Sequence, residues 1–356
     1  MDLFEECITI SNLFKENKLR KVPANCSRYF ERKSDAQNTP IATVDLDIDC
    51  TEMFVINTAF DESLIIQDLQ YCTTNRFQLN KSTENFKKVT HNQQFNQVVD
   101  IGCGQGEFVE YLRSANLKAI GFDPVLRNEN SYLTKGFFKP LENRLGTKNI
   151  YTMRCVLPHL RNPFAFLKEI LFSDSQAMIY IEYQNLEWII GEQVWSQISH
   201  DHVNYFSIKS FDSNFNVLAK GLFGNGEWGF ALIDGKKSNN KIRCHSNLEK
   251  LIKLEENIPA LLEKSIRRTN APIGIYGAAG KGMLFAYELK KLGIEGVVAY
   301  DEESLHWSKF LEASGTQVRN PIEIAAFDLS TDLIVMNSNH YDYAVNKFGA
   351  WVDVYK

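Results

Sequence analysis

A glycine-rich turn between two apolar stretches is the strongest chemical signal in the sequence. Residues 98–102 predict a short strand that ends on Gly102, residues 108–112 predict a helix, and Gly104 and Gly106 stand between them. At the start of a helix, residues without a Cβ let a ligand come close to the backbone N–H groups. The turn therefore predicts a ligand-binding loop.

Asp123 indicates which ligand this loop takes. It ends the next predicted strand, 117–123, where a carboxylate can accept hydrogen bonds from both hydroxyls of a ribose. A dinucleotide is disfavoured, because Glu107 stands where the dinucleotide fingerprint has its third glycine and would repel a pyrophosphate. A cofactor with a ribose, a positive sulfonium and an amino-acid tail fits this acidic site better.

A second glycine loop, 277–282, also follows a predicted strand and begins a predicted helix, 278–289. Its N–H groups could bind a phosphate, with Lys281 adding positive charge. It is not a Walker A loop, because Ile275 replaces the first glycine and Gly282 the Ser or Thr that binds magnesium. The alternative is a degenerate Rossmann unit that only packs against the first domain.

The elements around the two loops repeat the same order. Strands are predicted at 98–102, 117–123, 149–156 and 176–183, with helices between them, and again at 272–277, 295–301 and 329–337. Strands that alternate with helices form a parallel, doubly wound sheet, so the fold class is α/β. Residues 1–80 predict a small irregular domain with a strand in 41–55, followed by units at 81–235 and 236–356.

Composition excludes several kinds of partner. Lys plus Arg is 39 and Asp plus Glu is 44, a net charge of −5, which gives no global basic field for a nucleic acid. No apolar run approaches the roughly 20 residues that span a bilayer. The 7 scattered cysteines indicate reduced thiols rather than a disulfide scaffold. We therefore expect a cytoplasmic protein with a small-molecule substrate and neither nucleic acid nor membrane as partner.

The first unit resembles a known family. Asp100-Ile-Gly-Cys-Gly-Gln-Gly106 resembles the first motif of the class I S-adenosylmethionine-dependent methyltransferases, and Ile120-Gly-Phe-Asp123 resembles their second. The resemblance implies S-adenosylmethionine as cofactor and a Rossmann-like methyltransferase domain. It places Asp123 on the ribose, the 102–106 loop with Cys103 around the methionine portion, and Asp100 near the amino group.

Three further stretches narrow the resemblance. Residues 154–163, 200–207 and 275–282 are similar, in order and spacing, to C-methyltransferases of nucleotide-linked 4-keto-6-deoxy sugars. That family implies three parts: a small zinc-binding domain, a methyltransferase domain and a C-terminal Rossmann-like domain. Such a reaction needs a base that removes the proton beside the ketone.

The same resemblance implies the site residues. It makes His202 the general base, with Asp201 as the carboxylate that orients it or raises its basicity. Substrate contacts are expected from Tyr71, His159, His200, Tyr205 and Lys281. Alternatively, His159 caps the helix near Pro163, and His200 with His202 forms a metal-binding or purely structural pair. Ser199 and Asp201 stand where the family has Tyr and Glu, which favours a substrate different from that of the usual sugar enzymes.

The N-terminal part departs from the family's zinc site of two C-x-x-C pairs. Cys7-Ile-Thr-Ile10 and Cys50-Thr-Glu-Met53 each keep only the first cysteine. Two thiolates cannot close a tetrahedral site, so we predict a metal-free remnant; a site completed by distant residues is the alternative. The expected function is carbon methylation of a nucleotide-linked keto sugar, with an O- or N-methyltransferase or a catalytically silent binding protein as alternatives.

Overall fold

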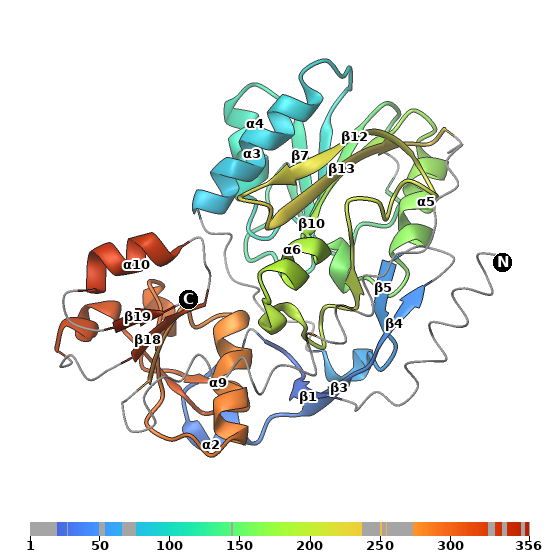
Figure 1. The fold of residues 1–356 in the computed structure, drawn as a ribbon. Helices are drawn as coiled ribbons and strands as arrows, with labels where there is room; N and C mark the ends of the chain where they lie inside the picture. The colour runs from blue at the N-terminus through green and yellow to red at the C-terminus, as the bar shows by residue number, and fades with distance from the viewer. Residues whose placement is uncertain are drawn as a thin grey trace.

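The computed structural model describes residues 20–26, 28–49, 54–65, 76–143, 145–236, 250, 254, 273–326, 332–336, 340–349 and 353–355. Two seven-stranded sheets dominate this part of the chain (Figure 1). The first, with β7, β10, β12 and β13, occupies the upper part of Figure 1, and the second, with β18, lies below it. Among the helices described, none has the length and apolar character needed to cross a membrane.

The first sheet has the strand order β12-β13-β10-β9-β6-β7-β8. Five neighbouring strands, from β8 to β10, pair in parallel, whereas β13 runs antiparallel to β10 and β12. The bounds are β6 Val98–Ile101, β7 Ala119–Asp123, β8 Leu133–Lys135, β9 Ile150–Arg154, β10 Met178–Gln184, β12 Asn216–Phe223 and β13 Trp228–Asp234. The four strands predicted here are all present, and the doubly wound α/β fold class is confirmed.

The helices of this unit begin where the sequence signals a start. α4 (Glu107–Ser114) follows Gly106, whose φ of 96° suits a residue without a Cβ. α5 (Pro163–Ser173) begins on proline, whose fixed φ and missing N–H fit a first helical position. α3 (Arg76–Thr90) and α6 (Leu186–Gly191) complete the set.

The second sheet has the order β19-β18-β14-β15-β17-β16-β2. Its strands are β2 Tyr29–Phe30, β14 Ile273–Tyr276, β15 Val298–Tyr300, β16 Phe310–Leu311, β17 Gln317–Arg319, β18 Asp332–Val335 and β19 Asp353–Tyr355. The helices α9 (Lys281–Lys291) and α10 (Tyr341–Phe348) belong to this unit. The edge strand β2 comes from the N-terminal part and pairs with β16. The N-terminal part and the C-terminal unit therefore share one sheet, and the predicted domain division stays a prediction.

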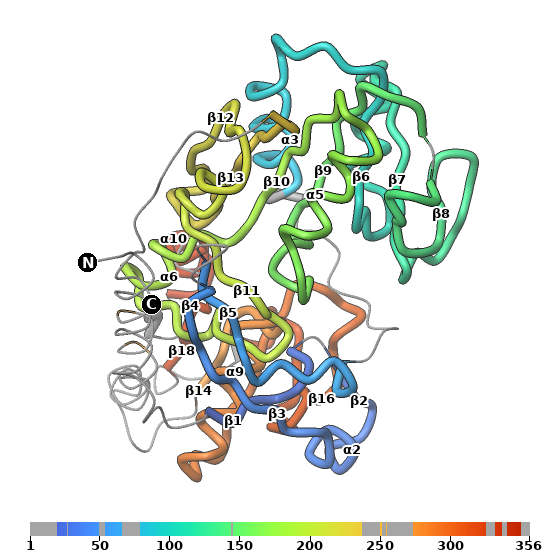
Figure 2. The backbone as a smooth tube through the Cα atoms, turned by 90° about the vertical axis from the view of Figure 1, so that its right-hand side faces the viewer, coloured from blue at the N-terminus to red at the C-terminus, as the bar shows by residue number. Residues whose placement is uncertain are grey.

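The N-terminal part forms two small sheets and corrects one prediction. The stretch 41–55 is not one strand but β3 (Ile41–Val44), β4 (Leu46–Asp49) and the start of β5 (Phe54–Asn57). The strand is interrupted at Asp45, whose N–H donates to the Asn57 side chain instead of to a sheet partner. β1 (Arg20–Pro23) pairs with β3, and β5 pairs with β4 and with β11 (Asn204–Tyr205). Figure 2 shows β4, β5 and β11 side by side.

One hydrophobic core joins all three parts. It includes Val22 of β1, Trp195 of the methyltransferase-like part and Phe285 of α9. The rings of Trp195 and Phe285 stack with centroids 5.8 Å apart. Arg20 adds polar contacts across the same junction. Its guanidinium donates to the Ile198 carbonyl at 3.0 Å and pairs with Glu288 at 3.3 Å. The segment that precedes the predicted catalytic histidine is therefore anchored from both sides.

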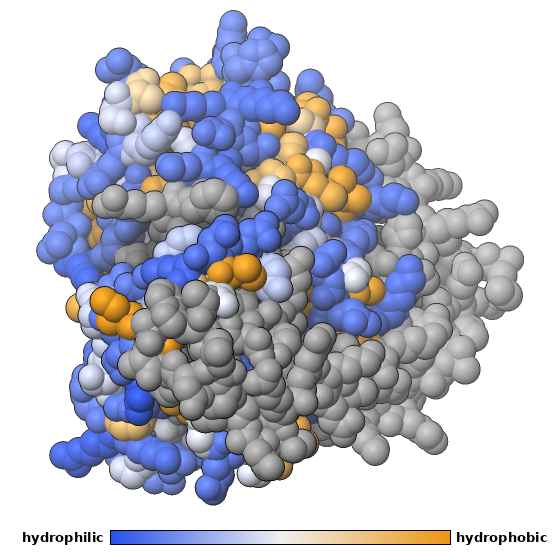
Figure 3. All heavy atoms as spheres, turned by 60° about the vertical axis from the view of Figure 1, so that its left-hand side comes forward, coloured by the Kyte–Doolittle hydropathy of each residue, from blue (hydrophilic) through white to orange (hydrophobic). Residues whose placement is uncertain are grey.

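The residues behind the zinc prediction cannot be placed. Cys7, Ile10, Cys50 and Met53 lie outside the described residues, so the metal-free remnant stays a prediction. On the face drawn in Figure 3, the described surface is mainly hydrophilic and its hydrophobic atoms form several separate groups.

We predict that Gly282→Ala destabilises the second unit. A Cβ at Gly282 would lie 1.9 Å from the carbonyl oxygen of Gly277, and backbone cannot move aside as a flexible side chain can. Such overpacking lowers the free energy of unfolding by about 1–3 kcal/mol or more. Urea denaturation measures this loss. Gly191→Ala is the matched control, because its Cβ would meet nothing within 4 Å and should cost no stability.

Candidate functional site

The first glycine loop lies where the strand order reverses. From β6 the chain adds β7 and β8 on one side and then returns to add β9 and β10 on the other. Ligands of open α/β sheets bind at the carboxyl ends of the two strands that flank such a reversal. Here those ends carry the 102–106 loop after β6 and the 155–159 segment after β9.

The three glycines have different neighbours. A Cβ at Gly102 would lie 2.3 Å from Val156, and one at Gly106 would lie 2.5 Å from Leu133. Gly104 has a φ of +60°, and its Cβ would meet nothing within 4 Å. Gly102 and Gly106 thus allow the loop to pack against the sheet, while the open side at Gly104 is where a ligand can approach.

Asp123 holds this loop in place. Its two carboxylate oxygens accept the N–H groups of Gly104 and Val125, each at 2.8 Å. Burial raises the pKa of Asp123, and these two backbone donors oppose the rise. A carboxylate offers about four lone-pair positions, so both oxygens can still accept ribose hydroxyls. Gln105 joins the same two loops through Val125 O at 3.2 Å and Arg127 N at 3.0 Å.

Asp100 is fully buried at the end of β6. Its Oδ1 accepts from the Thr152 hydroxyl at 2.6 Å, and its Oδ2 lies 3.5 Å from Arg154 Nη2. Within the described residues Oδ2 has no hydrogen-bond donor. A buried acceptor in that state favours a ligand that brings a donor. Cys103 packs its thiol inward, beside Gly121, so this residue faces the ligand only through its backbone.

Two histidines come together at the carboxyl end of β9. The rings of His159 and His202 have centroids 5.0 Å apart. His202 Nδ1 lies 3.0 Å from the Gln197 carbonyl, and His159 Nδ1 lies 2.8 Å from the Asp201 carbonyl. A carbonyl oxygen only accepts hydrogen bonds, so Nδ1 of each neutral ring carries the proton and Nε2 carries the basic lone pair.

Electrostatics keep His202 in its basic form. Burial lowers the pKa of His202, and the neighbouring Asp201 carboxylate opposes this only in part. Asp201 itself is 8% exposed. Burial alone would raise the pKa of Asp201, but the effect of His202 and His159 is larger. The pKa of Asp201 is therefore lowered overall, and the carboxyl stays ionised. The arrangement is a neutral imidazole beside a carboxylate, which suits a general base.

His200 and Tyr205 support this site rather than line it. His200 is fully buried, with Nδ1 3.0 Å from Thr43 O and Nε2 3.2 Å from the backbone of Asp61. Both ring nitrogens are therefore engaged by backbone groups, and the substrate contact of His200 stays a prediction. Tyr205 is 3% exposed and its hydroxyl donates to Ser199 O at 3.3 Å. Tyr71 lies outside the described residues.

Lys281 does not point freely at the second loop. Its ammonium pairs with Glu227 at 3.1 Å, lies 4.9 Å from the Trp188 ring centroid, and is buried at the junction of the two units. Burial lowers the pKa of Lys281, and Glu227 opposes this. The phosphate contact stays a prediction, and a phosphate that binds Lys281 would have to displace Glu227.

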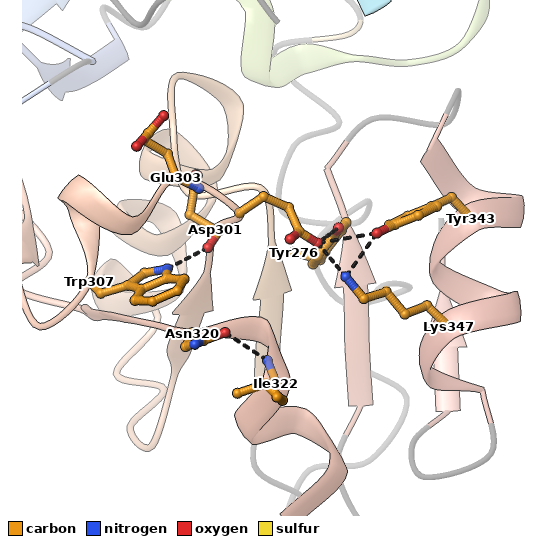
Figure 4. Close-up of polar contacts among 9 residues, drawn as sticks. Tyr276, Asp301, Glu303, Trp307, Asn320, Ile322, Tyr343 and Lys347 are labelled. Carbon is orange, nitrogen blue, oxygen red and sulfur yellow. Dashed lines mark hydrogen bonds and ion pairs between the residues drawn. The ribbon is translucent and has the colours of Figure 1, made fainter. Parts of the chain in front are cut away.

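The second loop nevertheless repeats the bonding of the first. The two oxygens of Asp301 accept from Ala278 N at 3.1 Å and Glu303 N at 2.9 Å. Figure 4 shows Asp301 and the neighbouring cluster, in which Tyr276 and Lys347 donate to Glu302 at 2.6 and 2.8 Å. Gly280 N donates to Cys26 O at 3.0 Å, so the N-terminal part occupies one N–H group of this loop.

Sequence reasoning missed Arg154 and Glu182. Both are charged residues on buried strands, and each lies on the same strand face as core residues. A charged residue at a core position was the signal that could have identified them. The structure brings Arg154 to Asp100 and makes Glu182 the acceptor of the Ser82 and Tyr180 hydroxyls, each at 2.6 Å.

Comparison with known proteins agrees with this geometry. Residues 73–216 match the family model of a methyltransferase domain. This part of the chain is similar to a methyltransferase domain. The match supports the predicted class of S-adenosylmethionine-dependent methyltransferases, whereas the finer sugar C-methyltransferase resemblance stays a prediction. No curated protein matches the chain significantly.

Solved structures with a similar fold cover the same part of the chain. A protein of Pyrococcus horikoshii OT3 is 14% identical, with a TM-score of 0.36 over 48% of this chain and 95% of its own. The plantazolicin methyltransferase BpumL, solved with a desmethylPZN analog and SAH, is 17% identical, with a TM-score of 0.35 over 46% and 87%. The methyltransferase domain of bacterial CtHen1 is 15% identical, with a TM-score of 0.32 over 44% and 100%.

We predict that His202 is neutral, with its proton on Nδ1, at pH 7. Its folded-state pKa is lowered from an unfolded value of about 6.5. Its contribution to stability is therefore fully present above pH 6.5 and is lost as the pH falls toward the folded-state value. Long-range nitrogen–proton NMR reports tautomer and titration together, with His202→Gln to assign the signal. An Nε2–H tautomer would contradict the prediction.

Proposed function

We propose that the chain is an S-adenosylmethionine-dependent C-methyltransferase that acts beside the ketone of a nucleotide-linked deoxy sugar, with His202 as general base. The observation that carries the proposal is the basic Nε2 of His202, oriented by the Gln197 carbonyl and placed beside the ionised Asp201. Val203 N donates to Pro158 O at 2.8 Å, which fixes the histidine loop to the segment that follows β9.

The residues of the first loop fit the cofactor. Asp123 and the open side of Gly104 suit the ribose, and Oδ2 of Asp100, which lies 3.5 Å from Arg154, suits the α-ammonium group. S-adenosylmethionine supplies an electrophilic methyl group when it is bound. No Cβ at Gly104 obstructs the approach to this side of the loop.

The histidine pair supplies the acid–base chemistry. His202 Nε2 removes the proton beside the ketone, and the ionised Asp201 stabilises the imidazolium that forms. His159 lies with its ring beside that of His202, and we assign it to contact with the substrate. The burial of Asp201 strengthens the charge interaction between its carboxylate and the imidazolium.

The second unit supports a substrate that carries a nucleotide. Asp301 and the 277–282 loop reproduce the carboxylate and loop arrangement of the cofactor site, and such an arrangement suits a ribose. The Lys281–Glu227 pair lies between the two units. We assign this pair to the border of the substrate site.

Replacing Asp123 tests the cofactor site. We predict that Asp123→Ala weakens S-adenosylmethionine binding roughly 5- to 100-fold, since hydrogen bonds to a charged acceptor contribute about 1–3 kcal/mol. Titration calorimetry measures the dissociation constant. Asp301→Ala is the matched control, because it removes the same arrangement from the second unit and should leave this affinity unchanged. Equal affinity of Asp123→Ala and wild type would move the ribose elsewhere.

Hydrogen exchange tests the base. We predict that the enzyme washes deuterium from solvent into nucleotide-linked keto sugars even without methyl donor, as enolisation precedes methyl transfer. His202→Ala should lower this rate by about 10²- to 10⁴-fold without changing cofactor affinity, and Asp201→Asn should lower it less. His91→Ala, at an exposed histidine, is the control.

Mass spectrometry reads both exchange and methylation. Methylation at full rate in His202→Ala would remove His202 from the mechanism. Methylation with no wash-in on any keto sugar would indicate an oxygen or nitrogen acceptor instead.

A further inference from the structure

One face of the first sheet changes from apolar to charged as its strands approach the cofactor loop. Side chains two apart on a strand share a face, and this face begins with core residues such as Val98, Ile150 and Tyr180. At the carboxyl edge the same face presents Asp100 on β6, Arg154 on β9 and Glu182 on β10. Register places Asp100 opposite Thr152, and Arg154 opposite Glu182.

Arg154 is the cation of this cluster. The ion pair with Asp100 joins side chains that are 10% and 1% exposed. The guanidinium lies 4.0 Å from the Phe108 ring centroid on α4, and Nη1 donates to the Ser82 hydroxyl of α3 at 3.4 Å. These contacts fix the guanidinium from two helices, so it cannot follow Asp100 if the loop moves.

The two carboxylates of the cluster differ in how they are satisfied. Both oxygens of Glu182 accept hydroxyl donors, from Ser82 and Tyr180. Asp100 has one hydroxyl donor, Thr152, and its Oδ2 faces Arg154 without a hydrogen bond in the described part of the chain. Two carboxylates and one guanidinium leave one negative charge over, which matches the positive charge of an α-ammonium group.

We propose that Arg154 is a positioning residue of the cofactor site, which holds Asp100 as a charged acceptor for the α-ammonium group of S-adenosylmethionine. This inference rests on the proposed function. Burial raises the pKa of Asp100, and Arg154 lowers it. Without Arg154, Asp100 would bind a proton nearer to neutral pH and would no longer attract a cation.

Several acidic groups also act on this cluster. Asp123, Cys103, Cys155 and Tyr180 interact electrostatically with Asp100, Arg154 or Glu182. Any charge on them is negative and raises the pKa of Asp100 further.

The test is the pH dependence of cofactor affinity, measured by calorimetry on the full chain with S-adenosylmethionine from pH 6 to 8.5. The ratio of dissociation constants, variant over wild type, cancels the titration of the ligand itself. For Arg154→Met the ratio should rise as the pH falls, to roughly 10- to 100-fold, the usual effect of one hydrogen bond to a charged group. Arg154→Lys keeps the charge and should show a smaller, flatter ratio.

Two further variants separate positioning from a merely structural role. Asp100→Asn should weaken binding equally at every pH, and adding Arg154→Met to it should introduce no pH dependence. Glu182→Gln removes the second carboxylate, so that Asp100 is the one carboxylate of the cluster left to pair with Arg154. The ratio of dissociation constants, Glu182→Gln over wild type, should therefore stay at or below one at pH 6. That variant keeps the test open if Arg154→Met does not fold.

The outcomes are distinct. The positioning role would be overturned if Arg154→Met lost affinity for S-adenosylmethionine equally at every pH. It would also be overturned if the ratio for Glu182→Gln rose above one at low pH. In both cases binding by the wild type would still support the cofactor site. Absence of wild-type binding at every pH would instead overturn the proposed function, and this inference with it.

Discussion

A carboxylate that accepts backbone N–H groups closes both described glycine loops, and the geometry of both units depends on it. Asp123 joins the 102–106 loop to the segment after β7, and Asp301 joins the 277–282 loop to the segment after β15. Each carboxylate accepts one N–H group from its loop, that of Gly104 or Ala278, and one from the segment after the neighbouring strand. The ligand then meets a loop whose shape is already set.

The histidine site depends on all three parts of the chain. His202 is oriented by a carbonyl of its own loop, while Arg20 holds Ile198 and His200 holds the backbone of Thr43 and Asp61. Strand pairing of β5 with β11 adds to this. These contacts attach the N-terminal part to the site through hydrogen bonds.

Buried ion pairs mark the junctions between the parts. Lys281–Glu227 joins the two large units, and Arg20–Glu288 joins β1 to α9. Removing a charge from water is costly, so such pairs persist where their geometry is fixed from both sides, and breaking one partner is strongly destabilising. Only the Lys281–Glu227 pair lies at the border that we propose for the substrate site.

The sequence by itself determined the strands of both large units, both glycine loops and the place of Asp123, because apolar periodicity and glycine at strand ends are local properties. The methyltransferase class was predicted from motif resemblance instead. Tertiary structure alone decided what each polar side chain meets. It turned Lys281 toward Glu227, engaged both nitrogens of His200, and oriented His202. It also assembled Asp100, Arg154 and Glu182 from three strands. Partners distant in sequence are set by strand register and packing, which no local pattern contains.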